Sequence, residues 1–477
     1  MSKGKNIRTN SFISTIRINN FISAIRTISF PGLISFIIIG LSLPGWAQEK
    51  PITLKQCIKS AIENKASLQG ARSEAIVAEF EKNEAMGKYL PQLTLNYEYK
   101  YNPIIATQVI PTGQLLPDPT EEYRAIKFGM TWQQNAGLTL YQPMLDFTIQ
   151  SKLNESRINE QVKRAGYEVS EEDLKYDVLQ SFANIYLYRQ QVEEAVVDSA
   201  RTYSSLSTIR NKFDEGKILK PDLNKAILNH NNAKASYGKA MSEVLKEKIF
   251  LSYLTGISVT ELFQSSFDFS PLASSNLDRY TTIRPTDSIA RIRELTLKEN
   301  LLNQQIRSER NKYVPQVGLE GFLGGNQYSQ TFDPFLANSW YGNSYLGISL
   351  KMPLMPGEST SSKVKQLKEQ TKITRSDKED LINELKKDYL VAGADIAQAK
   401  EEILTARANV ALMSENFAIY RERFEAGKID AGDLNLQELD LQKETANLSK
   451  LKATLVTRQV EQLNAAGNLN PFLDSVN

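Results

Sequence analysis

One stretch of the chain, Arg210-Asn211-Lys212-Phe213-Asp214-Glu215-Gly216-Lys217-Ile218, returns as Arg421-Glu422-Arg423-Phe424-Glu425-Ala426-Gly427-Lys428-Ile429. The offset between the two copies is 421 − 210 = 211 residues. An Asp-Leu pair follows each copy, at Asp222-Leu223 and at Asp433-Leu434. A doubled pattern of this length indicates a duplicated architecture, so any fold has to place the two copies equivalently.

Two further segments recur in the same order. Lys88-Tyr89-Leu90-Pro91-Gln92-Leu93 returns as Lys312-Tyr313-Val314-Pro315-Gln316-Val317, and Leu140-x-x-Pro143 returns as Leu350-x-x-Pro353. Each copy therefore predicts a helix, two strands, a long helix and a return helix. We expect an α+β protein with repeat one at 48–256, a connecting segment at 257–284, repeat two at 285–468 and a tail at 469–477. The expected helices are 52–89, 146–213, 219–256, 286–313, 359–425 and 431–467, and the expected strands are 91–102, 126–142, 315–325 and 341–353.

The first 47 residues predict an export signal. They are basic, then apolar over residues 33–41, and they end in Gly45-Trp46-Ala47, a small-x-small cleavage pattern. The apolar run is shorter than the roughly 20 residues that a membrane-spanning helix needs. No Cys follows the cleavage site, so acylation is not indicated. We therefore expect a protein of the periplasm, the cell surface or an outer membrane.

Composition excludes several function classes. The chain has 57 Lys and Arg against 55 Asp and Glu, a balance that gives no support to nucleic-acid binding. It has one Cys and one His, so an internal disulfide, a nucleophile–base pair and a His/Cys metal cluster cannot be assembled. Cys57 falls on an apolar helix face and His230 on a helix seam, where packing is the simpler interpretation. We expect no enzyme, no cofactor and no bound metal.

The long helices have a seven-residue seam. Apolar positions from residue 385 onward alternate steps of four and three, which is typical of a left-handed coiled coil. The seam residues are Leu385, Tyr389, Ala392, Ile396, Ala399, Ile403, Ala406, Val410, Met413, Phe417, Tyr420 and Phe424. No Pro interrupts residues 147–213, which predicts a helix of about 100 Å at 1.5 Å per residue. Such a helix has to pack along another long helix.

The predicted strands alternate apolar and polar residues at every step. Over about ten residues this fits transmembrane strands with a lipid-facing side and a polar side. The predicted lipid-facing residues are Leu95, Tyr97, Tyr99, Tyr101, Phe128, Met130, Trp132, Leu346, Ile348 and Leu350. Aromatic girdles are expected from Tyr97, Tyr99, Tyr101, Trp132, Trp340, Tyr341 and Tyr345. A soluble sheet with one face on a core fits the same alternation.

Four strands cannot close a barrel, and open strand edges are not tolerated in lipid. A membrane location therefore requires several chains to share one barrel, which implies a cyclic oligomer. The polar segments 102–125 and 326–340 would then be the turns outside the cell.

The turns and helix–strand junctions resemble those of the TolC family of outer-membrane efflux proteins, the outer membrane factors of tripartite efflux and type I secretion systems. The resemblance covers about residues 52–469. It rests on Leu90-Pro91-Gln92-Leu93 and Val314-Pro315-Gln316-Val317, on the two Phe-x-x-Gly turns with their Asp-Leu pairs, and on the helix start at Ile52-Thr53-Leu54.

The resemblance implies a homotrimer with a twelve-stranded barrel continued by an α-helical tunnel. Such a protein is a passive exit duct in the outer membrane of a Gram-negative-type bacterium and extends into the periplasm. It docks to a periplasmic adaptor and, through it, to an inner-membrane transporter, to export small molecules, ions or proteins. Residues 257–284 and the tail would form a belt around the tunnel.

The resemblance also assigns roles at the two turns. Phe213, Gly216, Phe424 and Gly427 would form the periplasmic tips and dock to the adaptor. Asp222 and Asp433 match the acidic constriction of the family, although capping of the return helices is the simpler explanation of an Asp there, and the two roles can coexist. The family prototype locks its closed tip with Tyr and Arg, and Phe424 and Ile429 stand at those places here. The polar latch is therefore missing.

A second functional interpretation stays open. The chain fits a soluble coiled-coil scaffold of the periplasm or cell surface, with the alternating segments in small soluble sheets.

Overall fold

The structure is a computed structural model, and it describes residues 51–111, 123–272, 274–281, 289–333, 340–354 and 358–475. The chain divides into one unit at residues 1–48 and a second at 49–477, and the described residues belong to the second. The predicted signal peptide at 1–47 lies outside the described residues.

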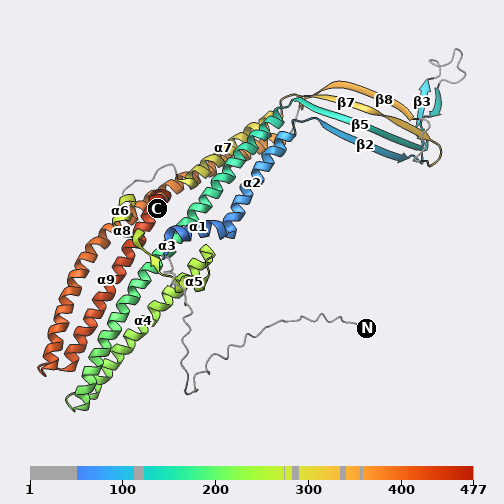
Figure 1. Ribbon diagram of the computed structural model, residues 1–477. Coiled ribbons are helices and arrows are strands. Elements are labelled where there is room, and N and C mark those ends of the chain that lie inside the picture. The colour runs from blue at the N-terminus through green and yellow to red at the C-terminus, as the bar shows by residue number, and fades with distance from the viewer. Residues whose placement is uncertain are drawn as a thin grey trace, which may run out of the picture. The chain divides into compact units, whose positions relative to one another are not determined.

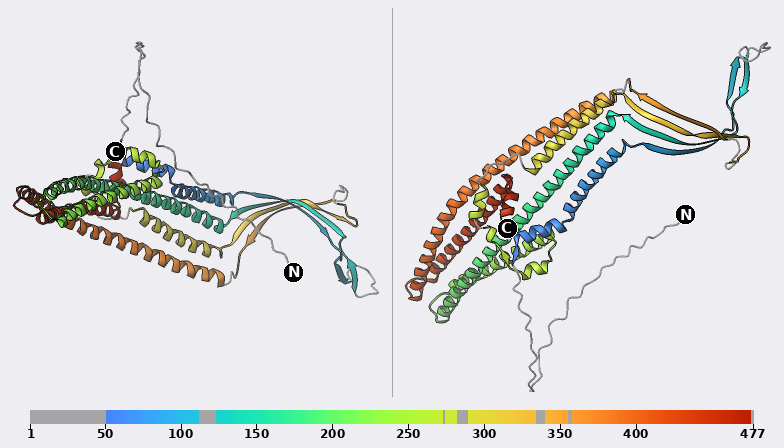
Figure 2. Two further views of the ribbon diagram at one scale, coloured as in Figure 1. Left: turned by 90° about the horizontal axis from the view of Figure 1, so that it is seen from below. Right: turned by 45° about the horizontal axis from the view of Figure 1, so that its top comes forward.

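Long helices form most of the second unit, in two antiparallel pairs (Figure 1). α3 (Phe147–Asp214) packs along α4 (Lys220–Thr255), and α8 (Glu358–Glu425) packs along α9 (Ala431–Ala465). α3 and α8 each have 68 residues; the absence of Pro from residues 147–213 predicts the long α3, and the heptad seam from residue 385 predicts the long α8. Both pairs end in turns at the end remote from the strands (Figure 2).

Two shorter helices pack beside the long helices on the side of the strands. α2 (Ala66–Gly87) packs on α3, and α7 (Ala290–Asn311) packs between α3 and α8. No helix in the described ranges combines enough length and apolar character to cross a bilayer.

The expected helix at 52–89 is wrong in one respect, because the chain breaks at Lys65. α1 (Leu54–Asn64) ends there, and Lys65 has extended backbone angles of −71° and 113°. The break lets Asn64 and Ser60 reach α4, where their side chains donate to the Thr255 carbonyl over 3.1 and 2.9 Å. These two hydrogen bonds satisfy the last carbonyl of α4, which its own helix leaves free.

The strands form one antiparallel sheet in the order β2-β5-β7-β8. The bounds are Gln92–Tyr101 for β2, Trp132–Leu145 for β5, Gln316–Ser329 for β7 and Trp340–Lys351 for β8. The central pair β5–β7 joins a strand of the first half of the chain to a strand of the second. Strands β2 and β8 are the edges.

The expected strand at 126–142 is wrong, because it is two strands in different sheets. Residues 123–127 form β4 (Tyr123–Lys127), which pairs with β3 (Thr107–Pro111), and β5 begins only at Trp132. Gly129, with φ of 130°, lies in the break. Such a backbone conformation suits glycine and ends the ladder. The apolar alternation continues through this break, so it could not reveal it.

The connecting segment and the tail are folded rather than extended. They contain α5 (Val259–Gln264), β6 (Phe267–Asp268), a 3-10 turn (Ser270–Leu272), α6 (Ser274–Thr281) and α10 (Leu469–Ser475). β6 pairs in parallel with β1 (Ile52–Thr53). Phe182 of α3 lies 5.8 Å from the Phe267 ring and 5.2 Å from the Phe269 ring. This aromatic contact anchors the segment on the middle of α3.

The heptad seam of α8 is buried where the helix faces α9. Ala392, Ile396, Ala399, Ile403, Ala406, Phe417 and Phe424 are all buried. On α4, where His230 was expected on the seam, Ala226, Ala233 and Ala240 are buried at intervals of seven residues. Each lies three residues after Leu223, His230 or Tyr237, which are less buried. The small side chains therefore make the close approach between α3 and α4.

Candidate functional site

The strand register shows which of the predicted lipid-facing residues share one face of the sheet. Directly opposed residues of an antiparallel sheet share a face, and the faces alternate along each strand. Leu95 opposes Leu138, which opposes Leu323, which opposes Ser344, two residues before Leu346. The same face carries Leu95, Tyr97, Tyr99, Tyr101, Trp132, Leu346, Ile348 and Leu350. Phe128 and Met130 lie outside the sheet, in the break before β5.

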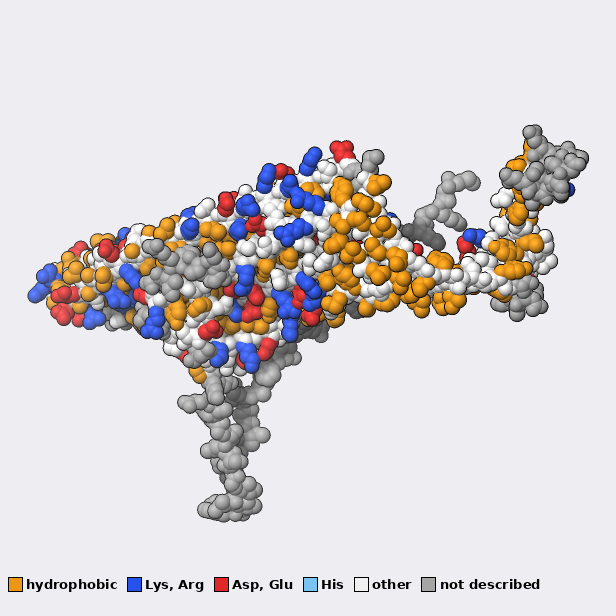
Figure 3. All heavy atoms as spheres, turned by 90° about the horizontal axis from the view of Figure 1, so that it is seen from above, with side chains coloured by type: hydrophobic (Ala, Val, Ile, Leu, Met, Phe, Trp, Pro, Cys, Tyr) orange, Lys and Arg blue, Asp and Glu red, His pale blue; other side chains and the backbone are white. Residues whose placement is uncertain are grey.

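This face is apolar and largely uncovered in the single chain. Leu95 is 73% exposed, and Leu346, Ile348 and Leu350 are 71 to 72% exposed. Figure 3 shows hydrophobic side chains concentrated toward the strands, while charged side chains are spread over the helical part. A contiguous apolar surface of this kind marks a protein or membrane contact.

The opposite face of the sheet is polar. Asn135 donates to the side-chain oxygen of Asn326 over 2.8 Å, and Asn96 donates to Thr139 over 3.1 Å. Lys100 and Glu98 form an ion pair at 2.7 Å. The sheet therefore has one face suited to lipid and one suited to water.

The expected aromatic girdle needs a correction. Tyr341 and Tyr345 oppose Asn326 and Phe322, which places both tyrosines on the polar face, away from Tyr97. The Tyr345 ring stacks on the Phe322 ring at 6.0 Å. Phe322 in turn covers Gly137, where an added Cβ would lie 2.4 Å from the ring. Trp340 keeps the expected face, in register with Tyr99 through Gln327 and Gln134.

Part of the apolar face is covered by the chain itself. Phe332, which follows β7, lies 5.0 Å from Trp132 and 5.5 Å from Tyr99 between ring centres. Gln134 is only 2% exposed beneath this segment, and it donates to the Asp333 carbonyl over 3.0 Å. Tyr99 is therefore less exposed than its strand neighbours.

The two tip turns have the same backbone geometry. Gly216 and Gly427 have φ of 73° and 72°. In each turn the glycine N–H donates to the Phe three residues earlier (2.8 and 3.0 Å), and the next N–H reaches back five residues (2.8 and 2.9 Å). This is the Schellman arrangement, which satisfies the last carbonyls of a helix and requires the left-handed residue that glycine supplies.

Asp222 and Asp433 occupy the first turn of the two return helices, but neither is the capping residue. The cap of α9 is Asp430, whose carboxylate accepts the Asp433 N–H at 2.9 Å. The cap of α4 is Leu219, without a side-chain bond. The capping interpretation of Asp222 and Asp433 is therefore wrong. Among the described residues neither carboxylate has an ion pair. Their negative charges can therefore interact with the helix dipole or with ions from the solvent.

A contact that the sequence did not predict joins the two tips. The Lys212 ammonium, in the last turn of α3, lies 3.8 Å from the centre of the Phe424 ring of α8 and donates to the Phe424 carbonyl. Phe424 is only 2% exposed. The sequence does show a basic residue in the last turn of this helix, but it does not indicate that Phe424 is the partner of Lys212.

Above the tips, a buried polar cluster joins α3 to α9. Asp198 accepts a bond from Gln442 at 2.5 Å and pairs with Arg201, whose Nε lies 3.9 Å from Glu438. Glu438 is 2% exposed, and this burial raises the pKa of its carboxyl, against the opposing effect of Arg201. Sequence reasoning missed Glu438 because its position in the repeat is apolar in the other copy, at Ile227.

The single His and the single Cys have packing roles in this structure. His230 Nδ1 lies 3.2 Å from the Thr202 hydroxyl of α3. Cys57 is fully buried, and desolvation raises the pKa of its thiol to about 12. No group of three metal-binding side chains occurs within the described ranges.

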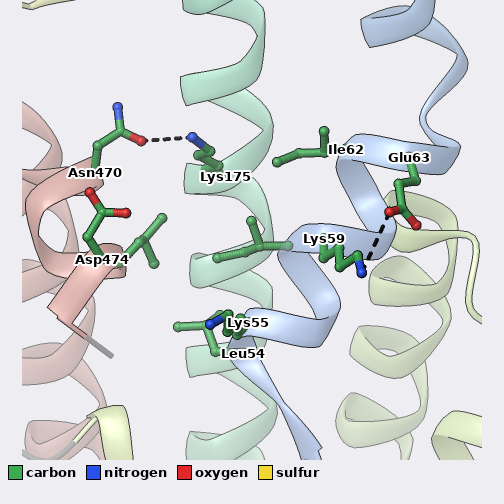
Figure 4. Close-up of a pocket in the computed structure, with 10 residues that line it drawn as sticks. Leu54, Lys55, Lys59, Ile62, Glu63, Lys175, Asn470 and Asp474 are labelled. Atoms are coloured by element: carbon green, nitrogen blue, oxygen red, sulfur yellow. Dashed lines mark hydrogen bonds and ion pairs between the residues drawn. The ribbon is translucent and has the colours of Figure 1, made fainter. Parts of the chain in front are cut away.

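A hollow of about 380 Å³ lies between α1, α3 and α10 (Figure 4). Its apolar wall includes Leu54 and Ile62, and its rim carries Lys59 and Lys175. Lys59 pairs with Glu63 at 4.0 Å, and Lys175 donates to Asn470 at 2.9 Å. Lys59 and Lys175 are thus engaged within the chain, and the hollow presents no convergent reactive groups.

Comparison with known proteins agrees with this geometry. Residues 290–468 match the family model described as outer membrane efflux protein. This match lies within the second half of the chain. The family predicted from the turns and junctions is therefore confirmed. A comparison of the chain with curated sequences found no match.

Solved structures share the fold of this chain at low sequence identity. CusC matches with a TM-score of 0.70 and 16% identity, over 87% of this chain and 91% of CusC. The CmeC outer membrane channel of Campylobacter jejuni matches with a TM-score of 0.66 and 15% identity, over 93% and 94% of the two chains. The MtrE outer membrane channel of Neisseria gonorrhoeae, in its open state, matches with a TM-score of 0.65 and 16% identity, over 87% and 89%.

Proposed function

We propose that this chain is the passive exit duct of a tripartite export system in the outer membrane. Three copies would combine their sheets into one twelve-stranded barrel, and their helices would continue the pore into the periplasm as a tunnel. The duct itself catalyses no reaction, and the energy for export comes from an inner-membrane transporter reached through a periplasmic adaptor. The exported material is small molecules, ions or proteins.

The observation that carries this proposal is the sheet with two unlike faces and two open edges. In the described part of the chain, β2 pairs only with β5, and β8 pairs only with β7. Unpaired backbone groups are not tolerated in lipid, so the edges need partners from other copies. Pairing β8 of one copy with β2 of the next closes a ring, with the apolar face outward and the Asn135 face lining the pore.

The helices supply the second support. α3 and α8, at 68 residues each, carry the pore away from the sheet and end in two tips of equal geometry. Equivalent tips on one ring suit an adaptor that contacts both, and this supports docking at Phe213, Gly216, Phe424 and Gly427. The soluble-scaffold alternative is not favoured, because it leaves the Leu346 face of the sheet uncovered.

The test places a charge on either face at the same depth. Leu346→Arg puts a cation on the proposed lipid face, at a cost of about 2–4 kcal/mol per chain near the bilayer middle. Gly347→Arg is the matched control. Gly347 is adjacent to Leu346 in β8 and faces the proposed pore, opposite Glu320. A Cβ added at Gly347 has no atom within 4 Å. We expect Leu346→Arg to abolish trimers extracted from outer membranes by detergent, and Gly347→Arg to retain them. Equal trimer yields in size-exclusion chromatography with light scattering would contradict the proposed membrane face.

A further inference from the structure

The contact between Lys212 and Phe424 fastens the end of α3 to the end of α8. The Phe424 carbonyl accepts the Gly427 N–H at 3.0 Å and the Lys212 ammonium as well. The last carbonyls of a helix carry partial negative charge, so a cation there is favourable. The ring face adds a cation–π attraction at 3.8 Å. One side chain of the first tip thus binds the second tip by two kinds of interaction.

The internal repeat assigns an equivalent to each partner. At the offset of 211 residues, Arg423 corresponds to Lys212, and Phe213 corresponds to Phe424. The Phe213 carbonyl accepts the Gly216 N–H at 2.8 Å, in the same Schellman geometry as Phe424. The second tip therefore carries a cation in the position of Lys212, and the first tip carries an acceptor of the Phe424 type.

Within one chain this second pair is unused. Arg423 is exposed and Phe213 is partly exposed. Across the described residues, the Arg423 guanidinium has no ion pair, hydrogen bond or ring contact. Lys212 connects the first tip to the second, so the equivalent contact connects the second tip to the next first tip. In a closed ring of identical chains, that next tip belongs to another copy.

We propose that Arg423 of one copy binds the Phe213 ring and carbonyl of the neighbouring copy, and that this contact joins the tips of successive subunits. It takes the place of the polar latch that Phe424 and Ile429 cannot provide. The inference rests on the proposed function, because it needs the ring of three copies.

A second level of the same interface supports the mapping. Within the chain, Arg201 lies 5.5 Å from the Phe417 ring and 3.9 Å from Glu438. The repeat equivalents of Arg201, Phe417 and Glu438 are Leu412, Leu206 and Ile227. Leu412 is 57% exposed in the single chain. All three equivalent positions are thus apolar, and Ile227, which is only partly buried within its own chain, is the partner that the repeat assigns to Leu412 on the next copy.

Cysteine cross-linking distinguishes contacts within a chain from contacts between chains. The variant Arg423→Cys/Phe213→Cys is treated with a short bis-maleimide in detergent-solubilised protein, and the reagent is quenched before denaturation. Cys57 can stay in place because it is buried. The matched control is Lys212→Cys/Phe424→Cys, whose cross-link forms inside one chain. The single variants Arg423→Cys and Phe213→Cys control for reaction between like positions.

We expect Arg423→Cys/Phe213→Cys to give covalent dimers and trimers on a denaturing gel, and the control pair to remain at monomer mass. Trimers seen by light scattering without these covalent products would overturn the Arg423 contact while leaving the duct intact. Absence of trimers from the unaltered chain would instead remove the proposed function, and the contact with it. If the double variant does not assemble, photo-reactive benzoyl-phenylalanine at position 213 has to label a neighbouring chain at Arg423. Labelling elsewhere would also overturn the proposal.

Discussion

Asp222 and Asp433 hold the third position of α4 and α9, and their carboxylates are free of ion pairs in the described chain. A ring of carboxylates around a pore favours cations over anions. We expect Asp222→Asn and Asp433→Asn, alone and together, to lower cation selectivity in single-channel recordings. Asp440→Asn removes an exposed acid about two turns farther along α9 on the same helix face, so a smaller change in selectivity from this variant would place the constriction at the tip. Unchanged selectivity in all variants would restrict both aspartates to the helix dipole.

Glu438 gives the tip region a dependence on pH. Its carboxyl is 2% exposed, and burial raises its pKa above the ordinary value of 4.5. A raised pKa means that the folded state binds the proton more tightly, so folding is favoured at low pH and loses stability as pH rises above 4.5. We expect Glu438→Gln, which cannot ionise, to flatten this part of the stability curve. Thermal denaturation from pH 4 to 8 measures the effect, and parallel curves for the two proteins would exclude Glu438 as its source.

At the scale of the element, the helix ends depend on their glycines. Gly216 and Gly427 have positive φ with open space around the Cα, so an added Cβ meets no neighbour and strain arises from the backbone alone. We expect Gly216→Ala and Gly427→Ala each to cost about 1–2 kcal/mol. Gly238→Ala in α4 is the control, because this helical glycine also has open space, and alanine should stabilise it by about 1 kcal/mol. Hydrogen exchange of the last turns of α3 and α8 measures the loss, and unchanged exchange would show that the Schellman turns tolerate alanine.

Element boundaries also show where sequence patterns stop being informative. The heptad seam of α8 and the absence of Pro from α3 predicted both helices to within a residue or two, because neither segment contains a signal that ends a helix. The break at Lys65 was not predicted, since the residue that α1 contacts after it, Thr255, lies far along the chain. The break at Gly129 was hidden because apolar alternation records which face a side chain occupies, not whether pairing continues.

At the scale of the whole molecule, the sheet faces could be predicted but the tip contacts could not. Alternation placed Leu95 and Leu346 on one face, and the register agrees. Lys212 and Glu438 escaped prediction because each acts through a partner that only the packing of two helix pairs brings near. The internal repeat still helps to identify tip contacts. Once the contact between Lys212 and Phe424 is known, the repeat indicates Arg423 and Phe213 as the partners in a second contact.

The parallel pair of β1 with β6 has a consequence for how the chain acquires its structure. The Ile52 N–H donates to the Ser266 carbonyl at 2.8 Å, and Ile52 aligns with Phe267. A contact between residues so distant in sequence carries a large loop-closure cost and forms late. Residues that leave the ribosome early must therefore wait, unpaired, until a partner more than two hundred residues downstream has been synthesised. During that interval β1 has no strand to pair with, and chaperones can bind this part of the nascent polypeptide.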